Sequence, residues 1–107
     1  MPTPIAPNGL PVSSAWLFPE YDFARMAPTE YAGVIIERIL DRGEQEEIDW
    51  LFKQYGKRRV AQWVRQHGYR LLNYDMFVHW RTKLGIKRYT VPPWEKGNER
   101  TKNWNQY

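Results

Sequence analysis

Residues 34–56, VIIERILDRGEQEEIDWLFKQYG, decide the fold of this chain. On each side of Gly43 the apolar residues recur three and four positions apart, which is the spacing of one apolar face on an α-helix. Only a short connection separates the two faces, so the stretch predicts two amphipathic helices joined as a helical hairpin. The predicted buried faces are Ala32, Ile35, Ile36, Ile39 and Leu40 in the first helix, and Ile48, Leu51, Phe52 and Tyr55 in the second.

The residues at the ends of these helices fit the same prediction. Pro28 is expected in the first turn of the first helix, where the missing N–H of proline costs nothing. Gly43 and Gly56 follow the last apolar residue of each helix, so each is expected to end its helix, Gly43 in a left-handed conformation. The glutamates of residues 44–47 occupy the start of the second helix, where the helix dipole favours negative charge.

Two further helices follow the hairpin. Residues 57–67 are expected to form a helix with a buried face and to end at Gly68, and a fourth helix is expected from Asn73, a favoured N-cap residue, through Leu84. Together these patterns predict an all-α protein, a compact bundle of about four short helices within residues 16–86. The expected inner faces are Val60, Trp63, Val64 and His67 in the third helix, and Phe77, Trp80 and Leu84 in the fourth.

The two ends of the chain have a different composition. Residues 1–15 contain four prolines, which favours a flexible or extended N-terminal arm. Residues 87–107 form a basic tail dotted with aromatic residues, in which Pro92-Pro93 and residues 97–107 are expected to be disordered when free and Tyr89-Thr90-Val91 to be at most a short extended piece. Removing residues 1–12 or 97–107 should therefore change the stability little.

Composition excludes several classes of protein. The chain has 107 residues, 42% of them hydrophobic, and no cysteine, which places it among globular proteins without disulfides or thiolate metal sites. No apolar run approaches the roughly 20 residues that cross a bilayer, and the N-terminus does not resemble a signal peptide. We therefore expect a cytoplasmic protein.

The charge is distributed unevenly along the chain. Nine acidic and three basic side chains lie in residues 1–52, whereas three acidic and thirteen basic ones lie in residues 53–107. This uneven distribution of charge leaves the basic half available for nucleic acid or an acidic partner. The alternative is that the two halves neutralise each other within the fold.

No group of residues suggests catalysis. His67 and His79 each lack a second histidine or carboxylate at the spacing of a helical metal site, except that Asp75 stands four residues before His79. An exposed pair of this kind is usually a surface interaction. There is no Gly-rich phosphate loop and no serine or cysteine nucleophile in a suitable setting. The sequence therefore predicts a protein without enzymatic activity, cofactor or metal.

Two sets of residues are candidates for binding. The third helix carries cations suited to phosphates and amides suited to base edges, although a solvated helix face is the commoner explanation of such a charge run. Trp50 lies on the polar face of the second helix, where it either packs under the N-terminal arm or contacts a partner, and Trp94 in the tail is a second candidate for partner contact. The candidates for binding nucleic acid or an acidic partner are Lys57, Arg58, Arg59, Gln62 and Arg65.

Several motifs occur in an order that resembles an uncharacterised bacterial family of small helical proteins. The resemblance covers roughly residues 16–86, and residues 35–40 with Arg42-Gly43 are its strongest part. Members of that family are often encoded beside abortive-infection (AbiEii-type) nucleotidyltransferase toxins. The resemblance implies a non-catalytic, antitoxin-like protein partner of such a toxin, and a small DNA-binding regulator is the alternative. The other motifs are Leu17-Phe18, Tyr21-Asp22-Phe23, Trp50-Leu51, Tyr55-Gly56, Phe77 with Trp80, and Leu84-Gly85-Ile86.

Overall fold

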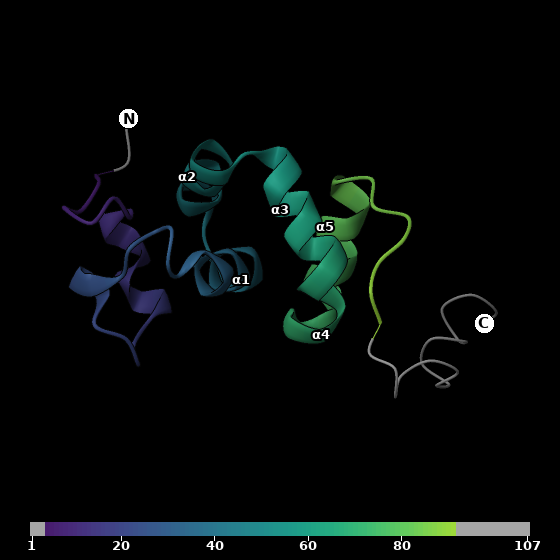
Figure 1. The fold of residues 1–107 in the computed structure, drawn as a ribbon, viewed down its shortest axis with the longest axis horizontal. Coiled ribbons are helices and arrows are strands. Elements are labelled where there is room, and N and C mark those ends of the chain that lie inside the picture. Colours follow the sequence, from purple (N-terminus) through teal and green to yellow (C-terminus); the bar gives the residue numbers. More distant parts are fainter. Residues whose placement is uncertain (1–3, 92–107) are drawn as a thin grey trace.

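The computed structural model describes residues 4–91 and confirms the predicted all-α fold (Figure 1). Within these residues no strand forms, and Ile5 and Pro11 make an isolated antiparallel bridge. None of the described helices is long and apolar enough to cross a membrane. The elements are the 3-10 helices η1 (Val12–Leu17) and η2 (Phe23–Arg25), then α1 (Ala32–Arg42), α2 (Gln45–Tyr55), α3 (Lys57–Trp63), the π-helical turn η3 (Val64–Gly68), α4 (Tyr69–Leu71) and α5 (Tyr74–Lys83).

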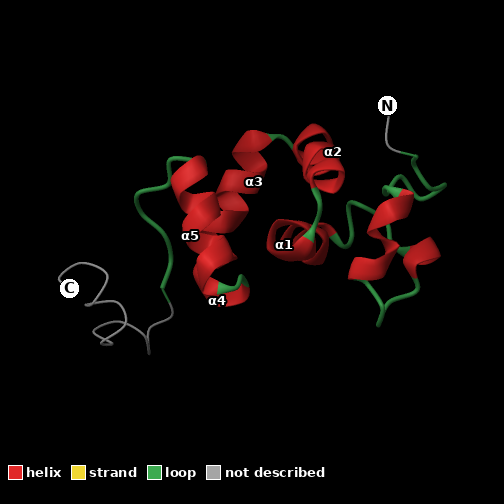
Figure 2. Cartoon of the chain, turned by 180° about the vertical axis from the view of Figure 1, so that it is seen from behind, coloured by secondary structure: helices red, strands yellow, loops and turns green. Residues whose placement is uncertain are grey.

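Helix α1 lies at the centre of the fold. Figures 1 and 2 show it between the N-terminal segment on one side and α3 and α5 on the other, with α2 next to it. It contacts η1, α2, α3 and α5. Its predicted apolar face is buried as expected, with Ile35, Ile39 and Leu40 fully covered. The remaining members of this face, Ala32 and Ile36, are also buried.

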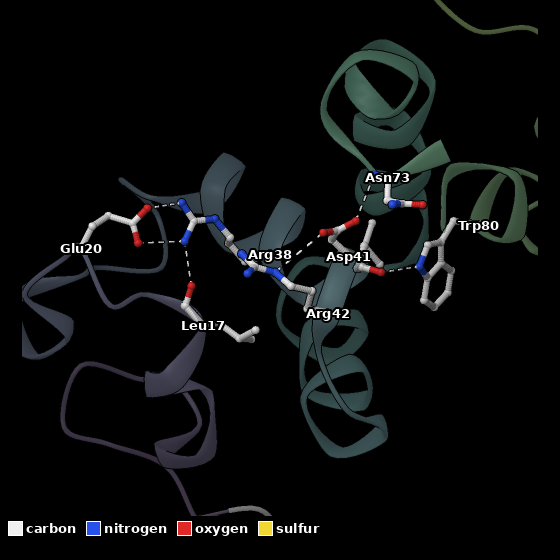
Figure 3. Close-up of polar contacts among 8 residues, drawn as sticks. Leu17, Glu20, Arg38, Asp41, Arg42, Asn73 and Trp80 are labelled. Atoms are coloured by element: carbon white, nitrogen blue, oxygen red, sulfur yellow. Dashed lines mark hydrogen bonds and ion pairs between the residues drawn. The ribbon is translucent and has the colours of Figure 1, made fainter. Parts of the chain in front are cut away.

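Arg38 joins α1 to the N-terminal segment (Figure 3). Its Nη1 donates to the backbone oxygen of Leu17 at 2.7 Å and to Oε1 of Glu20 at 3.0 Å, while its Nη2 pairs with Oε2 of the same carboxylate. This bidentate contact is the geometry in which a guanidinium binds a carboxylate most strongly. The helix thereby holds the end of η1 through a charged side chain as well as through its apolar face.

The contact between Arg38 and Glu20 predicts a dependence of stability on pH. The hydrogen bond from Arg38 lowers the pKa of Glu20 from 4.5 to about 2. Because the folded pKa lies below the unfolded one, the stabilisation is present above pH 4.5 and is lost as the pH falls toward 2. We expect the melting temperature of the parent to fall more steeply over this range than that of Glu20→Gln. Parallel melting curves for the two proteins, measured at low salt, would show that this ion pair does not stabilise the fold.

On its other side α1 is joined to α5 and to the turn before it (Figure 3). The indole Nε1 of Trp80 donates to the backbone oxygen of Leu40 at 2.9 Å, and this hydrogen bond is buried. The backbone N–H of Asn73 donates to Oδ1 of Asp41 at 3.0 Å, and the side chain of Asn73 accepts from the N–H of Asp75 as the predicted N-cap of α5. Trp80 is therefore a core residue whose polar atom is satisfied, as buried tryptophans require.

Residues 4–15 pack against the rest of the fold, which corrects the expected flexible or extended arm. Within residues 4–15, Leu10 is fully buried in the core. The side-chain amide of Asn8 donates to the backbone oxygens of Phe23 at 2.7 Å and Met26 at 3.0 Å. The prolines prevent a regular helix or ladder, but they do not prevent a turn in which backbone N–H and C=O groups hydrogen-bond to one another. Proline content alone therefore misled the prediction.

The start of α2 has the expected acidic character and an additional contact. Glu44 is the N-cap residue, and its backbone N–H donates to Oε1 of Glu47 at 2.8 Å in a reciprocal capping box. The other oxygen of Glu47 accepts from the hydroxyl of Ser13 at 2.7 Å. Glu47 is almost fully buried, and these two donors satisfy its carboxylate. The N-terminal segment thus also packs against the start of α2.

The glycines at the ends of α1 and α2 act in different ways. Gly56 has a φ of 87°, so it ends α2 in a conformation that favours glycine, as predicted. Gly43 is not left-handed, because its φ is −70°. A Cβ at this position would lie 2.6 Å from the backbone oxygen of Ile39, so close approach explains this glycine. Pro28 lies in the turn before α1 and not in its first turn.

The third helix does not end at Gly68, contrary to expectation. Its backbone stays helical there, with φ −61° and ψ −41°, and the helical path runs from α3 through η3 and α4 to Leu71. A Cβ on Gly68 would lie 2.9 Å from Cδ1 of Phe77 and 3.1 Å from Cγ1 of Val64. Glycine is needed here because α5 packs closely against η3, and not because the helix stops.

Candidate nucleic-acid interface

The five polar residues predicted on the third helix are all exposed, but they lie on three different surfaces. Arg58, Gln62 and Arg65 line one groove together. Lys57 lines a separate groove between α2 and α5. The guanidinium of Arg59 lies over an aromatic ring of α2, 5.1 Å from its centroid, beside a smaller depression. The structure therefore brings three of the five predicted residues together in one groove, and Gln62 also lines the depression beside Arg59.

The groove that holds these three residues also contains two cations from beyond α5. We call it the basic groove. It has a volume of about 620 Å³ and lies between the exposed side of α3 and η3 and the chain that follows α5. It is lined by Arg58, Ala61, Gln62, Arg65, Leu84, Gly85, Ile86, Lys87 and Arg88.

Lys87 and Arg88 reach the basic groove because the first residues of the expected tail are docked. After α5 the chain turns back beside the helices (Figures 1 and 2), and the N–H of Thr90 donates to the backbone oxygen of Arg65 at 2.8 Å. The ring of Tyr89 packs edge-on against Phe77, with 4.9 Å between centroids. Burial raises the pKa of Tyr89 above its ordinary value. Residues 87–91 are thus docked without forming a helix, and the segments expected to be disordered lie within residues 92–107, outside the described part.

The cations of the basic groove are not neutralised by acidic residues of the described chain. All three ion pairs within residues 4–91 join residues of the acidic half: Arg25 with Asp22, Arg38 with Glu20, and Arg42 with Asp41. No described ion pair links the two halves. Within residues 4–91, direct pairing between the two halves therefore does not account for the charge asymmetry, and the four cations of the groove are exposed.

The chemistry of the basic groove suits an extended polyanion. A guanidinium presents its N–H donors in a plane and binds two oxygens of one phosphate at once, and the groove offers Arg58, Arg65 and Arg88 for this. Lys87 adds a point charge, and Gln62 offers both a donor and an acceptor beside them. The combination of several cations with one amide is typical of surfaces that contact a nucleic-acid backbone and one base edge.

A second groove lies between α2 and α5 and has a volume of about 720 Å³. We call it the α2–α5 groove. The exposed surface of its lining is mostly apolar, whereas that of the basic groove is mostly polar, and three lysines are among the lining residues. The residues that line it are Gln45, Ile48, Asp49, Phe52, Lys53, Lys57, Met76, His79, Trp80, Lys83 and Leu84.

The two predicted partner-contact tryptophans have different outcomes. Trp50 is half-buried, and its ring packs edge-on against that of Tyr55 with 6.0 Å between centroids. It does not point away from Tyr55, as its position on the polar face had indicated. The hydroxyl of Tyr55 donates to the backbone oxygen of Pro28 at 2.7 Å, so this pair covers the turn before α1. Trp94 lies outside the described residues.

The histidines do not gather with other ligands. His67 is half-buried beside the ring of Trp63, and His79 is exposed beside the ring of Trp80. Within residues 4–91, no group of three or more histidine, aspartate and glutamate side chains is placed to hold a metal ion.

The fold and its two grooves define a small all-α protein with a solvent-facing cationic surface. Residues 14–64, just under half of the chain, match the family described as "Family of unknown function (DUF6922)". The match extends from η1 to the start of η3, so it includes Arg58 and Gln62 but neither Arg65 nor the segment after α5. It supports an uncharacterised domain. No curated protein and no solved structure matches the chain.

Proposed function

We propose that this chain is a non-catalytic DNA-binding module that contacts phosphates through the basic groove. The proposal rests on four cations from two separate segments that line one groove and take part in no ion pair of the described residues. These cations are Arg58, Arg65, Lys87 and Arg88. Phosphate contacts of this kind supply most of the affinity of nonspecific DNA binding and part of that of specific binding. The role of a small regulator fits such a surface.

The contact with DNA does not use a helix-turn-helix. That motif joins its two helices by a turn of about three to four residues. Here Gly56 alone joins α2 to α3, and both neighbouring residues are helical. The basic groove instead combines one helix face with a docked segment that is not helical. A preference for the promoter of the operon that encodes the chain would come from base contacts of Gln62, which suits adenine, or of the arginines, which suit guanine.

The test is a titration of fluorescent duplex DNA with the parent and with Arg58→Glu/Arg65→Glu. A charge-assisted hydrogen bond contributes about 1.5 kcal/mol or more, and about 1.4 kcal/mol changes affinity tenfold. Losing two such contacts should therefore weaken binding about 100-fold. The matched control is Lys53→Glu/Lys83→Glu, which changes the net charge equally but lies on the α2–α5 groove. Equal losses in both variants would indicate attraction by net charge alone and would contradict the proposal.

A second function is favoured by the α2–α5 groove, whose apolar floor offers nothing to a phosphate. We propose that the chain also binds a protein partner there, in the antitoxin-like role that the family resemblance implies, with a nucleotidyltransferase-type toxin as the partner. The test is co-expression with the product of the adjacent gene. Co-purification that is lost in Lys53→Glu/Lys83→Glu supports this role, and separate elution of the two parent proteins contradicts it.

A further inference from the structure

The floor of the α2–α5 groove consists of side chains that the fold leaves partly uncovered. Phe52 was expected to be almost fully buried with Ile35, Ile39 and Leu51, but it is only half-buried, whereas the other three are inaccessible. Its ring meets that of Trp80 at a centroid distance of 5.9 Å, which closes the bottom of the groove. The other half-buried side chains of the floor are Ile48, Met76 and Leu84.

The charges around this floor are mainly positive. Lys53, Lys57 and Lys83 line the groove, all three are exposed, and no described ion pair uses them. Asp49 is the acidic residue of the lining, and His79 is the other titratable group that faces it. An apolar floor flanked by three lysines is complementary to an apolar stripe flanked by carboxylates.

We propose that the α2–α5 groove binds an acidic amphipathic helix of a protein partner. An apolar floor between two helices is the surface on which a third amphipathic helix lays its apolar face, with anchors at i, i+3, i+4 and i+7. The elements on each side, α2 and α5, have 11 and 10 residues. At about 1.5 Å per residue they accommodate about three turns of a bound helix. This inference rests on the protein-partner role proposed above and names the chemistry of the partner.

A nucleic acid fits the α2–α5 groove less well than it fits the basic groove. Its phosphates would meet the lysines but would leave the half-buried apolar floor without a partner, whereas a helix with an apolar stripe would cover it. A second copy of this chain is also a weaker candidate. Its acidic helix start at residues 44–47 has Glu47 buried in the capping box, so only part of that charge is available.

The experiment measures the binding of three designed helical peptides to the intact chain by fluorescence anisotropy. The peptides share one apolar stripe of Leu and Trp and differ only in their flanking charges, which are acidic, neutral or basic. We expect the acidic peptide to bind the parent at least about tenfold more tightly than the basic one. In Lys53→Glu/Lys57→Glu/Lys83→Glu this order should reverse, while Lys87→Glu/Arg88→Glu, which alters the basic groove, should keep it.

Each other outcome overturns the inference in a distinguishable way. Saturable binding of all three peptides with equal affinity, or an order that the lysine reversal leaves unchanged, would show that the groove binds a helix without selecting acidic charge. Binding of none of the three would contradict the protein-partner role itself. Circular dichroism of each variant establishes that the helices are intact, which we expect because all three lysines are exposed.

Discussion

Leu51→Ala is expected to destabilise the chain by about 2–5 kcal/mol, the usual cost of truncating a buried leucine. Leu51 is inaccessible to solvent and packs within the same core cluster as Ile35 and Ile39 of α1. The loss combines the transfer free energy of the removed methyl groups with the cavity that remains. Thermal or urea unfolding measures it directly.

The matched control for Leu51→Ala is Gln54→Ala on the same helix. Gln54 is exposed, so its truncation should change the free energy of unfolding by less than about 0.5 kcal/mol. If the two variants unfold alike, the side chains of α2 face the core in a different register from the one described.

Deletion of residues 1–12 is expected to lower the melting temperature by about 10 °C or more. The deletion removes the fully buried Leu10 and both hydrogen bonds that Asn8 donates to the η2 region. Loss of a buried leucine costs about 2–5 kcal/mol, and 1 kcal/mol shifts the melting temperature of a domain of this size by roughly 4–8 °C. This expectation reverses the one drawn from proline content.

Two further variants serve as controls for the deletion of residues 1–12. Deleting residues 1–3 leaves every described residue in place and provides the comparison for a shortened chain. Leu10→Ala tests the buried contact without changing the chain length, and it should account for a large part of the loss. A deletion of residues 1–12 that melts within a degree or two of the parent would show that the segment does not stabilise the core.

Local patterns were sufficient for most of the helices. The apolar spacing in residues 34–56 and the cap at Asn73 depend on contacts within a few residues, and the structure confirms the two helices, the buried face of α1 and the cap. Of the face predicted for α2, Leu51 is buried, whereas Ile48, Phe52 and Tyr55 are half-buried. The register of α1 followed in the same way, because its apolar face is continuous and its opposite face is polar. Where a helix is amphipathic and capped, its sequence is enough to locate it.

Contacts between distant segments account for what the sequence did not reveal. Glycine at position 68 suggested the end of a helix, but the close approach of Phe77 from α5 is the reason for a glycine there. Lys87 belongs to the candidate site only because residues after it dock on η3, and no periodic signal marks that docking. The basic residues of α3 were recognised, but the helix path distributes them over three surfaces, and only the fold shows which of them act together.

The salt dependence of DNA binding tests the central claim most directly. If the four cations of the basic groove contact phosphates, the logarithm of the affinity should fall with the logarithm of salt concentration with a slope of about −3 to −4. Replacing Arg58 by Gln should flatten this slope by about one unit, and replacing Lys53 by Gln should leave it unchanged. A parent slope near zero, or the same slope in all three proteins, would contradict DNA binding through this groove.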